Sequence, residues 1–479
     1  MTKESSLPTE VSGQLRRTMG FWDVLLFNIA AVLGPRWIAA AAHNGTSSIS
    51  LWILAALFFF VPTALVVVEL STRFPEEGGL YVWSKEAFGD FHGFFAGWTY
   101  WVYTFFYFPG LLYASASMGA YIGGAGTANL AQNRMFLLAG SLVLLSVAVF
   151  MNIIGLNVGK WLQNAGGVGT YVPLLLLVGA AALVWHRSGS ATHFTWQNIW
   201  PKWDWGTVGF WPQIAFAFTG LELCSAMSEE IREPRKTLSR AIFGSGFLIA
   251  IIYVAGTVAV LVLLPSAVVH PTSGVFQALT QASTLVKFSA LGILAAVLVS
   301  VGNAGGVGST VAGVARVPFV VGVDRYLPAA FGKIHPRWKT PYVAILVQGI
   351  ISVVILLLGQ IRESPDSAYQ ILVDAATILY FVPFLYMYAA VIKLAYRRDR
   401  TEQKGAVLIP GGKWGVWLAG SLGFAVVLAG IALSLVPPGE TADKFVFELK
   451  LSSGVIVALL LGLVLYARGA RQKRLTGGQ

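Results

Sequence analysis

Charged residues are scarce in this 479-residue sequence. Aspartate, glutamate, lysine and arginine make up 11% of the chain, against about 25% in typical soluble domains. Hydrophobic residues make up 56%, and the mean hydropathy is +0.69. A soluble protein cannot bury that much apolar surface, so the composition indicates an integral membrane protein whose main surroundings are the lipid bilayer.

Cysteine occurs once, at Cys224 inside a hydrophobic run, which excludes a disulfide framework and a disulfide-linked subunit. Met1–Gly20 is polar and the first apolar run is too long for a signal peptide, so we expect no cleaved leader. The hydrophobic runs hold neither a set of nucleophile, histidine and acid nor a metal-ligand spacing. We therefore expect no enzyme, no cofactor and no metal site.

Twelve apolar runs account for most of the chain, and each approaches the length of about 20 residues that crosses a bilayer. They lie near 21–42, 50–72, 93–122, 135–155, 163–185, 208–228, 240–264, 288–315, 342–360, 369–394, 414–436 and 451–468.

The net charge of +11 comes from lysines and arginines in short loops between these runs. Charges in such loops set membrane orientation, so we exclude nucleic-acid binding. Of the 33 basic residues, 25 fall on one side of the predicted membrane, seven fall on the other, and Arg36 falls inside a run. Because basic residues concentrate in the cytoplasm, both termini are expected there.

The first run is interrupted at its centre by Gly34, Pro35 and Arg36. Proline removes an N–H and clashes with the preceding turn. A charge near the membrane centre costs about 2.5–3.5 kcal/mol on insertion scales. A helix broken in lipid is tolerated only where its backbone lines a cavity or faces protein. The stretch Asn28–Trp37 therefore predicts half of a binding site.

The sixth run is interrupted as well, at Gly220, and carries the acid Glu222 two residues later. Interrupted hydrophobic segments at corresponding positions of two halves point to the substrate site of a transporter near the membrane midplane. We predict that these two stretches form one site.

Three further patterns in the sequence predict structural features. Tyr100, Thr104 and Phe108 share one helical face of the aromatic third run, which lines the cavity if it points inward. Small residues over 302–310 in the eighth run predict tight helix packing, with ion binding as the alternative. The loop after Arg73 predicts a short interfacial helix from Leu80.

Four blocks of residues resemble the amino acid–polyamine–organocation (APC) superfamily of secondary transporters, and the resemblance covers nearly the whole chain. They are Pro75–Tyr81 with Gly97-Trp98, Phe216–Glu222 with Glu230 and Pro234, Arg316–Asp324 with Pro328, and His335-Pro336-Arg337 with Thr340-Pro341. The resemblance implies an all-α membrane protein of twelve transmembrane helices, a LeuT-type 5+5 inverted repeat plus two C-terminal helices.

On that resemblance the chain divides into five parts. They are a cytoplasmic segment over 1–20, a first five-helix repeat over 21–190, a second over 191–400, two peripheral helices over 401–470 and a cytoplasmic tail over 471–479.

The resemblance also implies site residues. The unwound first run would bind a substrate carboxylate, the carbonyls of the sixth would bind its amine, and Glu222 would couple protons. The implied substrate-binding residues are Leu33, Gly34, Pro35, Arg36, Tyr103, Thr104, Phe108, Phe216, Thr219, Gly220 and Thr310, and a possible ion site comprises Thr170, Ser309 and Thr310.

Two departures from the family pattern affect these expectations. Gly34-Pro35-Arg36 stands where a Gly-Ser/Ala-Gly motif is usual, so a backbone donor is replaced by a guanidinium. Thr170 stands where some proton-coupled members have a lysine. Sodium coupling and ion-independent or proton-linked exchange both remain open.

The sequence thus predicts a secondary transporter of neutral or acidic amino acids in the plasma membrane, as a monomer or homodimer. A polyamine or amine carrier is an alternative, although Arg36 would repel a polycation. A second alternative is a transporter-like nutrient sensor that binds substrate without moving it.

Overall fold

We describe a computed structural model of the chain. It describes residues 17–76, 78–201, 205–286, 290–323, 326–358, 365–397, 406–436 and 444–476. Most of the N-terminal segment over 1–20, the last residues of the tail, and the motif residues Glu77 and Asp324 therefore lie outside the description.

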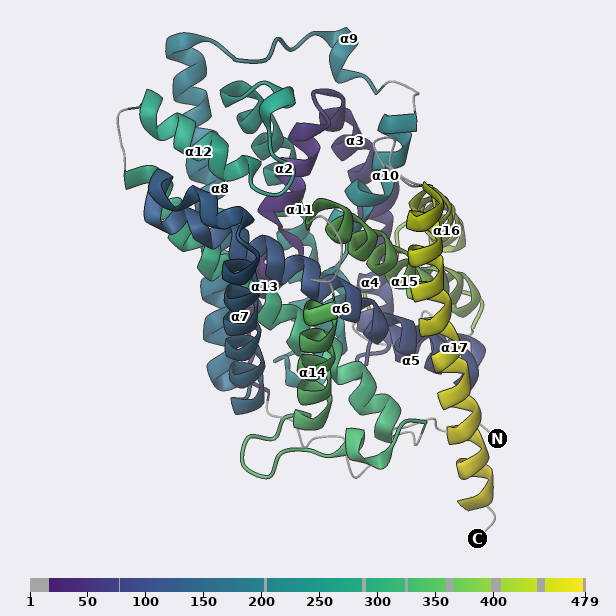
Figure 1. The fold of residues 1–479 in the computed structure, drawn as a ribbon. Coiled ribbons are helices and arrows are strands. Elements are labelled where there is room, and N and C mark those ends of the chain that lie inside the picture. Colours follow the sequence, from purple (N-terminus) through teal and green to yellow (C-terminus); the bar gives the residue numbers. More distant parts are fainter. Residues whose placement is uncertain are drawn as a thin grey trace.

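The described residues form helices joined by short non-helical connections, with one isolated β-bridge (Figure 1). Its elements are α1 (Phe21–Val32), α2 (Pro35–His43), α3 (Ser47–Ala55), η1 (Ala56–Phe60), α4 (Val61–Arg73), α5 (Leu80–Phe88), α6 (Asp90–Gly119), η2 (Ala120–Gln132), α7 (Arg134–Ile154), α8 (Leu156–Ser188), α9 (Trp196–Ile199), α10 (Trp205–Ala217), η3 (Leu221–Glu230), α11 (Pro234–Leu263), η4 (Ser266–Val268), α12 (Gly274–Leu285), α13 (Ala290–Val323), η5 (Ala329–Gly332), α14 (Tyr342–Leu358), α15 (Pro365–Leu394), α16 (Gly412–Ser434) and α17 (Lys444–Thr476).

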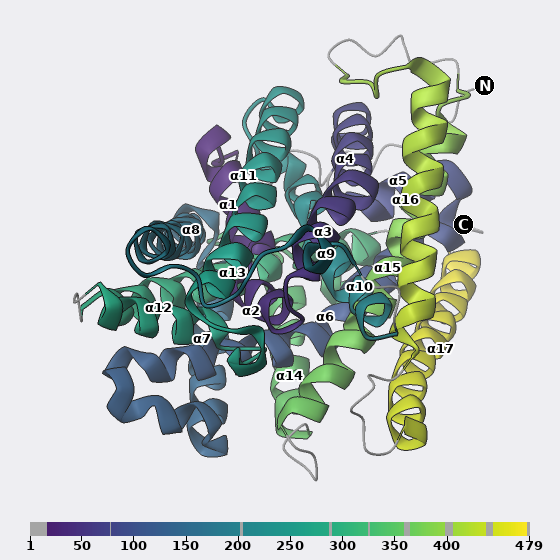
Figure 2. The same cartoon turned by 90° about the horizontal axis from the view of Figure 1, so that it is seen from above.

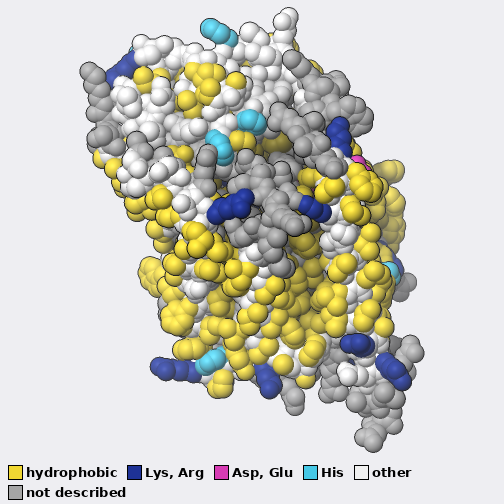
Figure 3. All heavy atoms as spheres, viewed as in Figure 1, with side chains coloured by type: hydrophobic (Ala, Val, Ile, Leu, Met, Phe, Trp, Pro, Cys, Tyr) yellow, Lys and Arg dark blue, Asp and Glu magenta, His cyan; other side chains and the backbone are white. Residues whose placement is uncertain are grey.

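Within the described residues, nine helical segments are long and apolar enough to cross a membrane, and α1 and α2 together form the first of them. Figure 3 shows a broad area of hydrophobic side chains on one face of the molecule, with several lysines and arginines along its lower border. All twelve predicted apolar runs overlap helices. The number of spans that actually cross the membrane stays a prediction.

The predicted break in the first run is confirmed. Helix α1 ends at Val32, Leu33 has extended backbone dihedrals, and α2 begins at Pro35. Proline suits this first helical position because its missing N–H would have no partner there anyway. The same residue that stops α1 therefore starts α2.

The predicted break in the sixth run is confirmed as well. Helix α10 ends at Ala217, and the chain turns at Gly220, whose φ of +113° lies in the left-handed region that favours glycine. A 3₁₀ helix, η3, continues from Leu221 and carries Glu222 in its first turn.

Small residues bring α8 and α13 into direct backbone contact, which confirms the packing interpretation of the eighth run. A Cβ atom added to Gly166 would lie 2.5 Å from Cα of Gly305. The next residue, Gly306, faces α1, because its Cβ would lie 2.7 Å from the carbonyl oxygen of Ala30. Helix α13 thus supports the last turn of α1 just before the break.

The far ends of the two broken segments also lie side by side. Met19, before α1, forms a parallel β-bridge with Ile231, after η3. Glu230 accepts a hydrogen bond from Nε of Arg316 on α13 at 2.8 Å, and the same carboxylate oxygen lies 2.8 Å from Nη2 of Arg316 in an ion pair. The broken segments are therefore joined to each other and to α13 at this end.

Helices α16 and α17 lie at one edge of the molecule, against α15 (Figure 2). Many of their apolar side chains face outward, including Trp414 at 86% and Leu418 at 71% exposed. This placement fits the predicted peripheral pair. The expected short helix after Arg73 is also present as α5, although Tyr81 and Trp83 are buried rather than interfacial.

Candidate functional site

Two adjoining pockets lie where the breaks face each other, and they share Ala31, Val32, Trp37 and Tyr107. The first, the Arg36 pocket, is lined by Ala30–Trp37 together with Tyr107, Leu111, Ala114, Ser115, Met118, Thr170, Gly302, Asn303 and Gly306. The second, the Phe216 pocket, is lined by Ala31, Val32, Trp37, Tyr103, Tyr107, Phe216, Ala217, Thr219, Gly220, Leu223, Thr310 and Tyr380.

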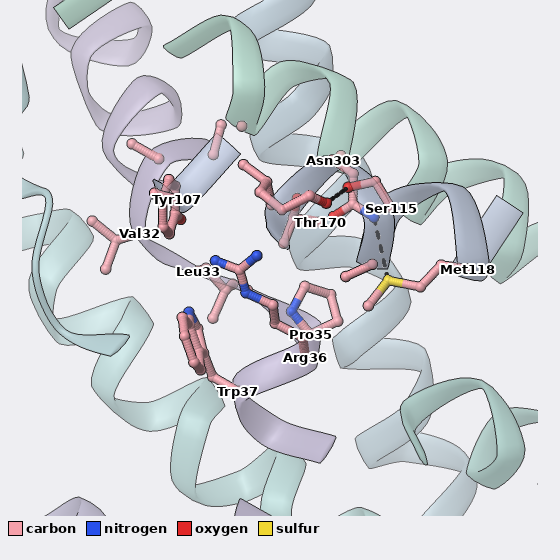
Figure 4. Close-up of a pocket in the computed structure, with 17 residues that line it drawn as sticks. Val32, Leu33, Pro35, Arg36, Trp37, Tyr107, Ser115, Met118, Thr170 and Asn303 are labelled. Carbon is pink, nitrogen blue, oxygen red and sulfur yellow. Dashed lines mark hydrogen bonds between the residues drawn. The ribbon is translucent and has the colours of Figure 1, made fainter. Parts of the chain in front are cut away.

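Arg36 is 3% exposed and points into the first pocket, between the rings of Trp37 and Tyr107 on one side and Thr170 and Asn303 on the other (Figure 4). Its guanidinium carbon lies 4.4 Å from the Trp37 ring centroid and 4.9 Å from that of Tyr107. These cation–π contacts offset part of the cost of burying the charge.

No described residue gives Arg36 a hydrogen bond or an ion pair, and its Nε is buried without a partner. Glu222 and Asp374 are buried acids that could neutralise Arg36, but neither forms an ion pair with it among the described residues. Glu222 is bonded to tyrosines, and Asp374 accepts from Gln370 at 3.1 and 3.2 Å. The guanidinium is therefore free to bind an anion.

The backbone around the first break offers few donors to a substrate. The N–H of Leu33 donates to Ile29, that of Gly34 donates to the Tyr253 hydroxyl at 3.3 Å, and that of Trp37 donates to Gly34. Pro35 has no N–H. An anion in this pocket would thus meet mainly the guanidinium and the positive end of the α2 dipole.

Aromatic rings enclose the Phe216 pocket. The ring centroid of Phe216 lies 5.7 Å from those of Trp37 and Tyr107 and 5.5 Å from that of Tyr380. Thr219 donates its hydroxyl to the carbonyl of Phe216 at 2.6 Å. These rings come from α2, α6, α10 and α15, so a shift of any of these helices changes the shape of the pocket.

Glu222 lies behind this pocket rather than in its lining, and it is 1% exposed. The hydroxyl of Tyr100 donates to its Oε1 at 3.0 Å, the hydroxyl of Tyr380 donates to the same oxygen, and the N–H of Gly220 donates to Oε2 at 3.1 Å. Because Tyr380 and Gly220 also line the pocket, Glu222 is one residue away from any ligand bound there.

The helical face expected to line the cavity from α6 is displaced by about one residue. Tyr103 and Tyr107 line the pockets, whereas Phe108 packs among apolar residues of α7 and α13 and Thr104 donates to the carbonyl of Trp101. Spacings of i, i+3 and i+7 share a helix face as readily as i, i+4 and i+8. The sequence pattern alone cannot choose between them.

The three residues of the possible ion site do not lie together. Ser309 has a buried hydroxyl without a described partner, and Thr310 donates to the carbonyl of Gly306 at 3.0 Å. Thr170 instead lies against Gly302, seven residues before Ser309 and so about 10 Å away along α13. Any ion held by Ser309 and Thr310 would therefore not reach Thr170.

Several residues of the site were missed from the sequence. Ser115, Met118 and Asn303 line the Arg36 pocket, and the Asn303 amide donates to the sulfur of Met118 at 3.3 Å. The sequence could have indicated Asn303, because it is the single amide side chain in the run of small residues over 302–310. The described residues include no cluster of three or more metal-binding side chains.

The chain is similar in sequence to several membrane transporters. The chain is 28% identical to the "Uncharacterized transporter lpg1691" of Legionella pneumophila, covering 93% of this chain and 96% of that one. It is 23% identical to the "Probable agmatine/putrescine antiporter AguD" of Lactococcus lactis (95% of both chains) and 28% identical to the "Serine/threonine exchanger SteT" of Bacillus subtilis (78% and 83%).

Among solved structures, MhsT in complex with L-phenylalanine has the same fold, with a TM-score of 0.64 at 14% identity over 86% of this chain and 97% of that one. Residues 19–465 match the amino acid permease family. The chain belongs to that family of membrane transporters.

Proposed function

We propose that this protein is a secondary transporter of amino acids that carry a free carboxylate and are neutral or acidic overall. The observation that carries the proposal is the buried guanidinium of Arg36, which faces a pocket without a described hydrogen bond or ion pair. A guanidinium fork matches a carboxylate bidentately, and charge-assisted bonds are about twice as strong as neutral ones.

In this proposal the substrate lies across both pockets. Its carboxylate binds Arg36, its amine binds near the end of α10, and Phe216, Thr219, Gly220 and Thr310 contact the rest of it. Alternating access would then follow from motion of the broken segments around this point, as in transporters with discontinuous helices.

Relatives support both an amino-acid and an amine substrate. SteT is named a serine/threonine exchanger and AguD an agmatine/putrescine antiporter. The charge of the pocket favours the first, because Arg36 would repel each cationic group by about 4 kcal/mol at 4 Å and an effective dielectric of about 20. The buried acids that a polyamine would need are Glu222, which already accepts three hydrogen bonds, and Asp374, which accepts from Gln370.

The topology that we propose is twelve spans, with spans 1–5 and 6–10 as inverted repeats over 21–190 and 191–400. Both termini lie in the cytoplasm of a plasma-membrane protein, on the charge bias of the loops. Cysteines introduced at Ser5 and Thr476 should resist an impermeant thiol reagent in intact cells, and labelling from outside would overturn this orientation.

The test of the function is uptake into liposomes that contain the purified protein, with a panel of labelled amino acids and amines. We expect uptake of at least one amino acid, loss of that uptake in Arg36→Ala, and no recovery in Arg36→Lys, because an ammonium lacks the fork. Normal uptake by Arg36→Ala, or a preference of the unmodified protein for polyamines, would refute the proposal. Binding without uptake would instead indicate a sensor.

A further inference from the structure

The two breaks are joined by one side chain, Tyr253 of α11. Its hydroxyl accepts the N–H of Gly34 at 3.3 Å, and it lies 2.7 Å from the carbonyl oxygen of Val32 and 2.9 Å from that of Ala217. One hydroxyl proton serves one of these carbonyls at a time. The same oxygen therefore bonds the end of α1, the residue before α2, and the end of α10.

The surroundings of Tyr253 hold this hydroxyl in place. The side chain is fully buried, and its ring stacks on Trp52 at a centroid distance of 4.3 Å and an interplanar angle of 8°. Phe218, just past the end of α10, meets the same ring edge-on at 5.3 Å. Trp52 is itself fixed by a hydrogen bond from its Nε1 to Thr257, one turn along α11.

The buried hydroxyl also satisfies groups that helix ends leave unpaired. Val32 and Ala217 are the last residues of α1 and α10, so their carbonyls have lost their helical partners. Buried backbone groups are almost always hydrogen-bonded, because leaving one unpaired is costly. While the breaks lie together, the two carbonyls share this one donor, and separating the breaks would remove one of them from it altogether.

We propose that Tyr253 is a positioning residue that makes the two breaks move as one unit. It also keeps the Gly34 N–H from the substrate, so that the carboxylate binds Arg36 instead; this second part rests on the proposed function. Tyr253 itself touches neither pocket, since it is absent from the lining of both.

The contacts of the Tyr253 hydroxyl with the two breaks are called the joint below. Hydrogen exchange measured by mass spectrometry tests the joint without reference to any substrate. In the full-length protein in nanodiscs, we expect Tyr253→Phe to speed exchange about tenfold in peptides that cover Val32–Arg36 and Ala217–Gly220. The phenyl ring keeps the stacking on Trp52. Other peptides should keep their rates.

Tyr388→Phe is the matched control. It also removes the hydroxyl of a fully buried tyrosine, which bonds Thr63 at 2.5 Å and lies outside both pockets. We expect it to leave exchange at the breaks and uptake unchanged. If Tyr253→Phe behaves like this control, or speeds exchange at only one break, the joint is refuted.

Should Tyr253→Phe fail to fold, the unmodified protein still decides the question. A shared joint predicts that the two peptides exchange at matching rates and gain protection together when substrate binds. Independent rates or protection of one peptide alone would refute the joint.

A double-mutant cycle on uptake tests the second part. We expect Arg36→Ala to reduce uptake about 100-fold, and Tyr253→Phe to restore part of it in the double mutant, because the freed Gly34 N–H then binds the carboxylate. Additive losses would refute the competition for Gly34 and leave the exchange result standing. No effect of Arg36→Ala would refute the proposed function instead.

Discussion

Each break holds one buried ionisable side chain, Arg36 at the first and Glu222 at the second, and the two side chains differ in their hydrogen-bond partners. At the first, Arg36 is buried with only two aromatic rings as partners among the described residues. At the second, Glu222 is equally buried but accepts bonds from Tyr100, Tyr380 and Gly220. The carboxyl group of Glu222 is therefore hydrogen-bonded within the protein itself, whereas the guanidinium of Arg36 has no hydrogen-bond partner among the described residues.

This difference in partners distinguishes a residue that can bind a ligand, Arg36, from one that stabilises the protein around the site, Glu222. A buried charge without a partner costs folding free energy, so we infer that the cost is offset when an anion binds. A buried charge with three donors is stable in the empty protein and matters to transport only if it changes its protonation or its partners. Buried charge alone would have ranked the two residues equally, and their hydrogen bonds distinguish them.

The largest effect that we expect is on Arg36. Replacing it with methionine, which has a similar volume, should reduce amino-acid uptake about 100-fold. The melting temperature without substrate should stay the same or rise, because an unpaired buried charge is removed. A melting temperature that falls by several degrees would mean that Arg36 has a structural partner, and the contrast between the two breaks would disappear.

Glu222 should show the opposite pattern. Glu222→Ala leaves the hydroxyls of Tyr100 and Tyr380 without their acceptor, so we expect a loss of about 2–4 kcal/mol in unfolding free energy. Glu222→Gln keeps most of the shape and should flatten the pH dependence of transport while substrate binding remains. An unchanged pH profile in Glu222→Gln would remove this acid from the coupling mechanism.

A smaller effect on uptake is expected when external sodium is replaced. Since Thr170 lies apart from Ser309 and Thr310, we expect an exchanger or a proton-linked transporter, in which uptake changes less than twofold when choline replaces external sodium. Ser309→Ala should then have little effect. A large loss of uptake at constant pH would show that Ser309 and Thr310 hold sodium.

The smallest effect is expected at the periphery. Trp414→Ala on α16 exposes no pocket and breaks no described hydrogen bond, so stability should change by about 0.5 kcal/mol or less. Uptake should also stay unchanged. A change in oligomeric state on size-exclusion chromatography would instead show that this face joins two copies of the chain.

The sequence located the breaks because helix-stopping residues act locally. Pro35 cannot continue a helix and Gly220 adopts a backbone conformation that other residues avoid, whatever surrounds them. The apolar runs were similarly readable, since every predicted run overlaps a helix. Residues around the breaks, including Arg36, Phe216 and Thr219, were therefore placed together.

The partners of these residues depend on tertiary packing, which the sequence does not express. Nothing in the run over 240–264 distinguishes Tyr253, yet it contacts both breaks. The rotation of α6 decided that Tyr107 rather than Phe108 faces the pocket. Likewise, the spacing of Thr170 from Ser309 follows from how α8 crosses α13.

The most direct test of the account compares one amino acid with its α-amide, in which a carboxamide replaces the carboxylate. Binding to the unmodified protein can be followed by the fluorescence of its tryptophans, since Trp37 lines both pockets. The account predicts that the amide binds about 100-fold more weakly, because it loses the charge-assisted bonds to Arg36. Equal binding of the acid and the amide would contradict it.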